Sequence, residues 1–452
     1  MQINTSALKL FNNPILLVCI SMLLYGVFAY DLERSDTTKL FTIYCILFVC
    51  FYKIIKNNKH NIKLLTWIAF VFRAVFILAV PNLSQDFYRF IWDGYMTVNG
   101  INPYLYTPEY QIGLGDISTI PNFHELYKGM GSLSASHYSN YPPINQSLFV
   151  LGNLIFGKSI LSSIIGLRLL IILADLGTLY YGKKLLKKLS IPEYNIYWYL
   201  LNPLILIELT GNLHFEGVML FFLIWSIYLL HLRKWKTSAI VFALSVSTKL
   251  IPLIFLPLLF QKLGWKRSLG FCSIVGLVTL LLFMPFYSND LITNYFETLG
   301  LWFQKFEFNA SVYYIIRAIG YWFSGYNLIA YIGVIIPFFV LIVILILAFL
   351  RKNKTTVQLI TVMLLGLSFY YFTATTVHPW YIGTLLILSI FTNYKFPLVW
   401  SFVIILSYLA YANSENQENL WIIALEYLVV YGFLIWELFF KKSMVKTIEI
   451  EP

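Results

Sequence analysis

Long apolar runs recur along this chain of 452 residues, and short polar loops separate them. Many of the runs reach about 18 residues, the length at which an α-helix can cross a hydrocarbon core roughly 30 Å thick. The pattern predicts an all-α integral membrane protein, a single domain over residues 1–452 with about twelve transmembrane helices. We expect these spans at residues 14–30, 38–56, 63–81, 160–182, 194–210, 216–232, 268–286, 328–350, 356–375, 378–394, 396–412 and 419–440.

One apolar segment, residues 237–260, has a different pattern. It is too short for two crossings, and Lys249 and Pro252 interrupt it midway. We therefore expect a short broken hairpin with Lys249 near its membrane-embedded tip. An unpaired ammonium group is costly there, so Lys249 should have either a ligand phosphate or a salt-bridge partner, Glu208 or Asp175.

The basic residues indicate the orientation of the chain. Under strict alternation of the spans, all clusters of Lys and Arg fall on one side, which the positive-inside tendency identifies as the cytoplasm. We therefore expect a multi-pass protein of the plasma (inner) membrane with both termini in the cytoplasm. The clusters lie at residues 53–63, 183–188, 233–236, 262–267, 351–354 and 441–446.

Composition narrows the possible functions. Charged residues make up 12% of the chain, about half of their usual share in a soluble domain. The net charge of +11 lies in the short loops and not on a soluble basic face, which argues against nucleic acid as a partner. The sequence contains no zinc motif, no phosphate-binding glycine-rich loop and no serine nucleophile elbow, so we expect neither a metal nor a cofactor. The chain also has no soluble nucleotide-binding domain. A transferase acting at the outer face would therefore have to use a lipid-borne donor and not a nucleotide-linked one.

The only long hydrophilic segment, about residues 82–159, is expected outside the membrane and should carry short helices. Ser84 is the expected N-cap of the first helix, which puts Asp86 in its first turn and Arg89 and Asp93 on the same face. A carboxylate at a helix N-terminus beside an arginine stays ionised and can accept a proton from a hydroxyl nucleophile. The competing interpretation is an ordinary capped helix at the membrane interface.

Other polar residues are predicted on the same outer side. Asn212, His214 and Glu216 occupy a tight loop between two spans and could hydrogen-bond sugar hydroxyls. His214 and Glu216 are two residues apart and would not share a face of a helix, so they are weak candidates for a metal site. His378 opens a predicted span, shortly before Tyr381. Two interpretations are open: His378 contacts a ligand, or it is an interfacial cap beside aromatic residues.

The first outer loop resembles that of bacterial multi-spanning mannosyltransferases of the GT-C superfamily. The resemblance rests on the stretch from Asp86 to Gly94 (DFYRFIWDG) and on Gly100 to Tyr104 (GINPY). It implies a GT-C-like bundle and covers roughly residues 80–385. Further matching segments follow in order: Tyr141 to Pro143, Asn202 with Pro203, Gly211 and Asn212 with His214, Lys249 with Pro252, Phe308 to Ser311 with Tyr313 and Arg317, and His378 to Tyr381.

The resemblance implies an inverting transfer with Asp86 as the base on the acceptor hydroxyl. The chain departs from the family pattern at Gln85, where a second acid is common. Either Asp86 works alone, or Asp93 or Glu216 supplies the second carboxylate. Basic residues are implied to hold the leaving polyprenyl phosphate, and no divalent metal is needed for this. The donor-phosphate residues are expected to be Lys249, Arg317 and His378.

The predicted function is therefore transfer of a hexose, most naturally mannose, from a polyprenyl-phosphate-linked donor to a glycolipid or glycan acceptor on the extracytoplasmic face. The alternatives are a transporter or flippase for a lipid-linked saccharide and an O-antigen polymerase or ligase. A transporter should place its polar residues near the bilayer midplane, whereas most of those here lie in outer loops. The residues expected to contact sugar or acceptor are Arg89, Trp92, Asn212, His214 and Tyr381.

Overall fold

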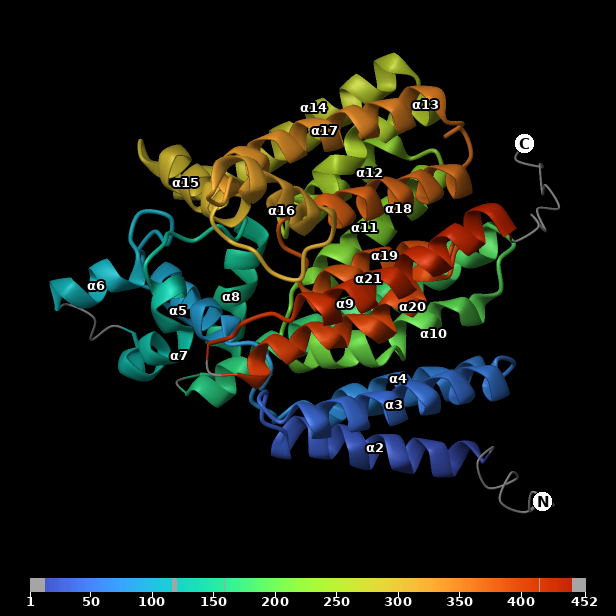
Figure 1. The fold of residues 1–452 in the computed structure, drawn as a ribbon, viewed down its shortest axis with the longest axis horizontal. Helices are drawn as coiled ribbons and strands as arrows, with labels where there is room; N and C mark the ends of the chain where they lie inside the picture. Colours follow the sequence, from blue (N-terminus) through green and yellow to red (C-terminus); the bar gives the residue numbers. More distant parts are fainter. Residues whose placement is uncertain (1–12, 116–119, 158, 414, 441–452) are drawn as a thin grey trace. The chain divides into compact units, whose positions relative to one another are not determined.

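The computed structural model describes residues 13–115, 120–157, 159–413 and 415–440, so both termini, with the last basic cluster, lie outside the described residues (Figure 1). Within these ranges every regular element is a helix, and 77% of the described residues are helical. The only β-type pairing in the described residues is an isolated parallel bridge between Phe308 and Thr376. The all-α class predicted from the sequence is therefore confirmed.

The chain forms two compact units, which are described separately. The first contains residues 1–252 and 273–302, and the second contains residues 253–272 and 303–452. The prediction of a single domain stays a prediction. Counted with the unit that holds most of their residues, the helices of the first unit are α2 (Pro14–Asp31), α3 (Thr37–Asn58), α4 (Ile62–Val75), α5 (Asp86–Val98), α6 (Pro108–Leu114), α7 (Phe123–Ala135), α8 (Pro143–Phe156), α9 (Ile160–Lys188), η1 (Glu193–Ile196), α10 (Tyr197–Leu200), η2 (Ile205–Gly211), α11 (Glu216–His231), α12 (Trp235–Val246), α14 (Trp265–Phe283), η4 (Met284–Phe286) and α15 (Leu291–Gln304).

The second unit is built from the remaining helices. Here α17 contacts α18, α18 contacts α19, and α20 packs between α19 and α21. The helices are η3 (Ile251–Leu259), α13 (Phe260–Leu263), α16 (Val312–Ser324), α17 (Ile329–Leu350), α18 (Thr356–Thr373), η5 (Pro379–Tyr381), α19 (Ile382–Ser389), α20 (Phe396–Val403), η6 (Ile404–Ala412), α21 (Leu420–Ile435) and η7 (Trp436–Phe440).

Seven helical segments in the described ranges are long and apolar enough to cross a membrane, and each falls on a predicted span. The prediction of a multi-pass membrane protein is therefore confirmed, although the count of about twelve spans is not. The seven are α2, α3, α9, α14 with η4, α17, α18, and α21 with η7.

The other five predicted spans fall on short or broken helices. α4 has only 14 residues, and η2 and α11 are bent by 108° at the break between them. The apolar runs at 378–394 and 396–412 likewise contain 3₁₀ turns next to short α-helices. Hydropathy does not reveal such breaks, because a 3₁₀ or π turn leaves the apolar pattern intact.

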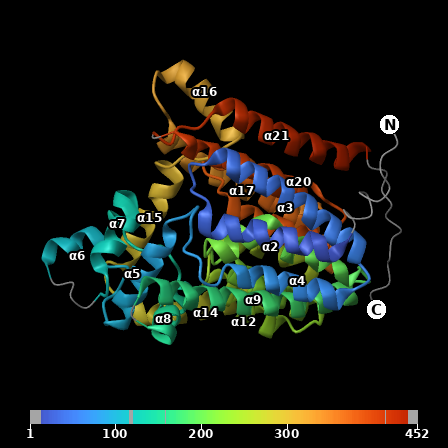
Figure 2. The same ribbon diagram turned by 90° about the horizontal axis from the view of Figure 1, so that it is seen from below.

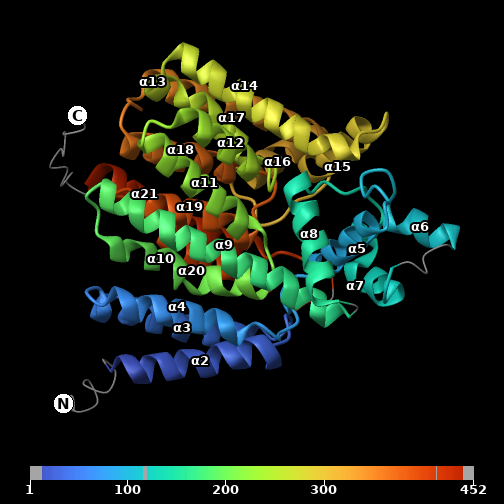
Figure 3. The same ribbon diagram turned by 180° about the vertical axis from the view of Figure 1, so that it is seen from behind.

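Four short helices of the hydrophilic segment, α5 to α8, gather at one end of the first unit, where all three views show them together (Figures 1, 2 and 3). We call residues 82–157 the α5–α8 lobe. Its core is aromatic: Phe90 stacks on Phe149 at 4.7 Å between ring centroids, and Phe215 meets both rings edge-on. Gly94 lets α5 and α8 approach closely, because a Cβ there would lie 2.7 Å from the Phe149 carbonyl oxygen.

Candidate active site

Asp86 is the first residue of α5. The sequence predicted Ser84 as the N-cap, but the cap position is Gln85, whose side chain makes no capping hydrogen bond. Ser84 still contributes, because its Oγ accepts a hydrogen bond of 3.3 Å from the Asp86 N–H. Asp86 therefore lies where the helix dipole favours a negative charge.

Two side-chain contacts hold the chain just before Asp86. The Leu83 N–H donates to Asn212 Oδ1 at 3.1 Å, and Gln85 Nε2 donates to the Met130 carbonyl at 3.1 Å. Asn212, which was predicted to bind sugar, is buried. In this structure its side chain anchors the segment that leads into α5.

Lys249 forms an ion pair with Glu216, with 2.5 Å between Nζ and Oε1. Glu216 opens α11, and Lys249 lies in the break between α12 and η3, where the interruption of the apolar segment was expected. The sequence named Glu208 or Asp175 as the partner, and this was wrong. Asp175 is paired with Arg73 at 2.7 Å.

The break that carries Lys249 is tied to the α5–α8 lobe through the backbone. The Ile144 N–H, at the start of α8, donates to the Ser247 carbonyl at 2.9 Å. Tyr141 lies three residues earlier and packs edge-on against Phe90 at 5.1 Å. The break near Lys249 is thereby linked, through the start of α8, to the segment that packs on α5.

The Glu216–Lys249 pair is incompletely satisfied. Within the described residues, Glu216 Oε2 is buried without a hydrogen-bond partner. The Glu216 side chain is only 4% exposed, whereas that of Lys249 is 26% exposed. The ammonium group is therefore held in place by one carboxylate oxygen and remains accessible to a further anion.

Electrostatics connect this pair to Asp86. Burial raises the pKa of Asp86 to about 6. The nearby Lys249 ammonium lowers this pKa, and the Glu216 carboxylate raises it further. Burial also raises the pKa of Tyr141 well above its usual value, and the Asp86 charge adds to that rise. Interactions of this kind act between nearby groups. We refer to Asp86, Tyr141, Glu216 and Lys249 as the Asp86 cluster.

Arg89 and Asp93 form a second ion pair on the same helix. Arg89 Nε lies 2.7 Å from Asp93 Oδ1, and the two side chains are 3% and 0% exposed. Gln146 Nε2 donates to the other oxygen, Oδ2, at 3.3 Å. The guanidinium also donates to the carbonyls of Ser134 and His137. Arg89 was expected to contact sugar and Asp93 to be a second acid, but here each binds protein groups.

Two further residues that were expected to contact sugar are also buried. Trp92 is fully buried in the lobe core, and its Nε1 donates to Gln111 Oε1 at 3.2 Å, so it has no surface for a sugar ring in this structure. His214 is 1% exposed, with its Nε2 at 3.6 Å from Glu208 Oε2. The sequence pattern placed both residues near the outer face but could not show their burial.

Arg317 belongs to the second unit and forms an ion pair with Glu307. Its guanidinium lies over the Tyr314 ring, 4.3 Å from the centroid. Glu307 also accepts hydrogen bonds of 2.5 Å from Tyr313 Oη and Asn327 Nδ2. Arg317 is thus held in a polar network whose acid the sequence analysis did not single out.

The acids of this network extend beyond Glu307. Glu418 accepts a hydrogen bond of 2.6 Å from the Asn309 N–H. Glu426 is fully buried and accepts from Asn309 Nδ2 at 3.1 Å and from Trp400 Nε1 at 3.0 Å. One signal could have found Glu426, because a carboxylate inside an apolar run is by default a residue with a specific role.

His378, also in the second unit, lies among aromatic rings. It stacks on Trp380 at 4.4 Å and on Phe308 at 5.1 Å between centroids. Tyr381 meets it edge-on at 5.4 Å. The imidazole is therefore held between aromatic rings, and its predicted contact with the donor phosphate stays a prediction.

In the part of the chain that the structure describes, no group of three or more His, Cys, Asp or Glu side chains is placed to hold a metal ion. The predictions of no metal and no cofactor stay predictions. The Asp86 cluster has two carboxylates and a cation, a set suited to proton transfer and to binding one anion.

Comparison with known proteins supports the enzyme class. No curated protein matches the chain. A family model described as the N-terminal domain of alpha-(1->6)-mannopyranosyltransferases matches residues 28–263, more than half of the chain. The match includes Asp86, Glu216 and Lys249 and ends before Arg317 and His378. The chain therefore belongs to the MptA_B family of alpha-(1->6)-mannopyranosyltransferases and is a glycosyltransferase of the GT-C type.

Proposed function

We propose that the protein transfers mannose from a polyprenyl-phosphate carrier to a glycolipid or glycan hydroxyl, with Asp86 as the general base. The observation that carries the proposal is the Asp86 cluster, in which a carboxyl group of pKa about 6 is influenced by a fixed ammonium group. A general base is most effective when its pKa lies near the working pH. Asp86 meets that condition and is largely ionised at neutral pH.

The proposed step is a single displacement with inversion at the anomeric carbon. The acceptor oxygen bonds to C1 of mannose while its proton moves to an Asp86 carboxylate oxygen. The bond between C1 and the phosphate oxygen breaks, and its electron pair leaves with the polyprenyl phosphate. Lys249 donates to that phosphate and balances its charge.

Glu216 is the second carboxylate that we favour, and Asp93 is not. Glu216 fixes the Lys249 ammonium and influences the pKa of Asp86, whereas both oxygens of Asp93 bind protein groups. Glu216 is a positioning residue in this mechanism, because it acts through Lys249. Arg317 and His378 belong to the second unit, and their role as donor-phosphate residues stays a prediction.

The sidedness of the site is part of the proposal. The basic clusters of the sequence support an extracytoplasmic α5–α8 lobe and a cytoplasmic C-terminal end of α9. A cysteine at Gly113 in α6 should react with an impermeant maleimide added to intact cells, and a cysteine at Lys187 should react only after permeabilisation. Labelling in the reverse order would place Asp86 in the cytoplasm and exclude an extracytoplasmic acceptor.

The test of the chemistry is transfer of labelled mannose from polyprenyl-phosphate mannose to extracted lipids by the purified protein. Asp86→Asn keeps the size of the side chain but removes the proton acceptor, so we expect turnover to fall by about 10²- to 10⁴-fold. The Asp86→Asn variant should still bind the donor and should remain folded in detergent. A flippase would move the donor across a vesicle membrane without forming a labelled product.

Glu109→Gln is the matched control for this test. Glu109 is also a first-turn acid, in α6, but it is exposed. It should therefore change transfer little. Near-normal transfer by Asp86→Asn, with Glu109→Gln equally active, would contradict the assignment of Asp86 as the base.

A further inference from the structure

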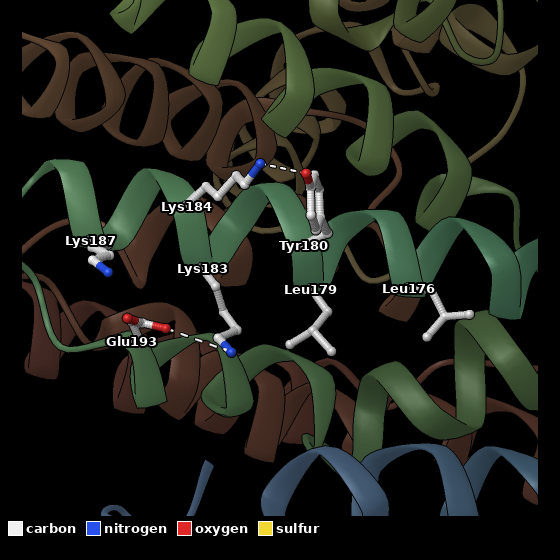
Figure 4. Close-up of a pocket in the computed structure, with 7 residues that line it drawn as sticks. All are labelled: Leu176, Leu179, Tyr180, Lys183, Lys184, Lys187 and Glu193. Carbon is white, nitrogen blue, oxygen red and sulfur yellow. Dashed lines mark hydrogen bonds and ion pairs between the residues drawn. The ribbon is translucent and has the colours of Figure 1, made fainter. Parts of the chain in front are cut away.

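A groove of about 450 Å³ lies along the C-terminal part of α9 (Figure 4). One wall is the helix itself, and the other carries Glu193 at the start of η1. The groove belongs to the first unit and contains none of the residues of the Asp86 cluster. It is lined by Leu176, Leu179, Tyr180, Lys183, Lys184, Lys187 and Glu193.

The exposed side chains of α9 change character in a regular order along this face. Leu173 and Leu176 are 61% and 45% exposed, and Tyr180 one turn later is 53% exposed. Lys184 and Lys187 follow on the same face and are also exposed. Positions separated by three or four residues share one face of a helix. The face therefore presents an apolar surface, then an aromatic ring, and then two ammonium groups.

The length of α9 explains this order. Its 29 residues extend about 43 Å at 1.5 Å per residue, which is longer than a hydrocarbon core of roughly 30 Å. The last turns therefore project into the headgroup region while the leucines remain beside acyl chains. Tyrosine is the residue type that membrane proteins place at this boundary.

The lysines of the groove carry more positive charge than the groove itself neutralises. Lys183 is paired with Glu193 at 3.6 Å. Lys184 donates to the Tyr180 hydroxyl and lies over the Tyr180 ring, 4.0 Å from its centroid (Figure 4). Tyr180 is neutral, so neither contact balances the charge of Lys184. Within the described ranges neither Lys184 nor Lys187 has a carboxylate at ion-pair distance. A phosphate group would supply the missing negative charge.

We propose that this groove binds an anionic phospholipid of the surrounding bilayer. The headgroup phosphate contacts Lys184 and Lys187, and one acyl chain lies along Leu173 and Leu176. Basic pockets beside membrane helices recognise anionic headgroups in this way. The apolar half of the face favours a lipid over a soluble phosphate, because the acyl chain of the same lipid packs on Leu173 and Leu176, whereas a free anion gains no such contact. The inference is independent of the proposed sugar transfer.

The test is native mass spectrometry of the purified, delipidated full chain titrated with phosphatidylglycerol and, separately, with phosphatidylcholine. The wild type should bind phosphatidylglycerol more tightly than phosphatidylcholine. Lys184→Gln/Lys187→Gln should weaken phosphatidylglycerol binding by about 30-fold, at roughly fivefold for each ammonium group removed. Sugar transfer and thermal unfolding should be unchanged, because both side chains are exposed.

Lys53→Gln/Lys56→Gln is the matched control. It removes the same charge from the end of α3, where Lys56 also lies near a tyrosine ring, at 5.6 Å from the Tyr52 centroid. This variant should bind phosphatidylglycerol like the wild type. Equal losses in the two double variants, or equal binding of the two lipids, would overturn a specific groove in favour of diffuse surface charge.

Two competitors identify the ligand class. Inorganic phosphate should not displace phosphatidylglycerol from the wild type, and displacement would show a simple anion site. A long-chain polyprenyl phosphate should compete weakly. If it instead binds the groove more tightly than phosphatidylglycerol, in a manner abolished by Lys184→Gln/Lys187→Gln, the proposed occupant is wrong.

Discussion

Two ion pairs of the first unit, Arg89–Asp93 and Glu216–Lys249, are close in chemistry but differ in exposure and in how completely the carboxylate is hydrogen-bonded. In the first pair both side chains are buried, both Asp93 oxygens accept hydrogen bonds, and the guanidinium also binds backbone carbonyls. In the second, one carboxylate oxygen has no partner within the described residues, and the Lys249 side chain is 26% exposed.

The difference separates a role in folding from a role in binding. A pair that is buried on both sides and whose carboxylate oxygens are both engaged is out of reach of a ligand, and removing one partner strands a buried charge. A pair with an accessible cation can exchange part of its hydration for a phosphate oxygen. The sequence predicted both Arg89 and Lys249 as substrate contacts. The structure shows that Arg89 is buried among protein groups, whereas Lys249 is partly exposed.

The largest effect should follow from opening the closed pair. Asp93→Ala leaves the Arg89 guanidinium buried without its carboxylate, which typically costs about 3–5 kcal/mol of stability. We expect a large loss of thermal stability in detergent and poor recovery of folded protein. The measurement is the unfolding transition followed by intrinsic fluorescence.

Asp31→Ala is the control for that measurement. Asp31 pairs with Lys39 at 2.6 Å, but its side chain is 75% exposed. Exposed pairs contribute about 1 kcal/mol or less, so this variant should unfold almost like the wild type. If Asp93→Ala were as stable as Asp31→Ala while losing transfer, Asp93 would act in the reaction and not only in folding.

Opening the incomplete pair should affect turnover more than folding. Lys249→Ala removes a charge that the proposed transition state needs, and losses of about 10²- to 10³-fold in kcat are typical for such a contact. Lys249→Arg should retain part of the activity, because it keeps the cation with a different shape. The measurement is mannose transfer at saturating donor, with unfolding as the control. Normal turnover by Lys249→Ala would reduce Lys249 to a partner of Glu216.

The sequence predicted features that depend on local pattern. The helix that carries Asp86, the break near Lys249 and the seven long apolar helices all follow from neighbouring residues, through charge and hydropathy, although the N-cap is Gln85 and not Ser84 as predicted. The partner of Lys249 did not follow. The sequence offers Glu208, Asp175 and Glu216 as acids that could pair with Lys249. In the structure Glu216 forms the pair, and it lies directly after the bend between η2 and α11, which the sequence does not reveal.

Burial was the second property that the sequence could not provide. Trp92 and Arg89 lie in the motif that carries the family resemblance, and a motif does not say which of its residues face a ligand. Both are buried by the packing of α5 on α7 and α8. The acids around Arg317 were missed for a related reason, since Glu307 and Glu418 are 111 positions apart and meet through Tyr314 and Arg317 only in the folded chain.

The smallest and sharpest effect concerns pH. If Asp86 is the base, kcat/KM should rise with pH through about 6, the pKa of its carboxyl group, and level off above it, because only the deprotonated form accepts a proton. Glu216→Gln removes a negative charge that raises this pKa, so the midpoint should move to lower pH while Glu109→Gln leaves it in place. The measurement is initial mannose transfer across a pH series at low substrate. A flat profile around pH 6, or a midpoint that Glu216→Gln moves upward, would mean that another group accepts the proton.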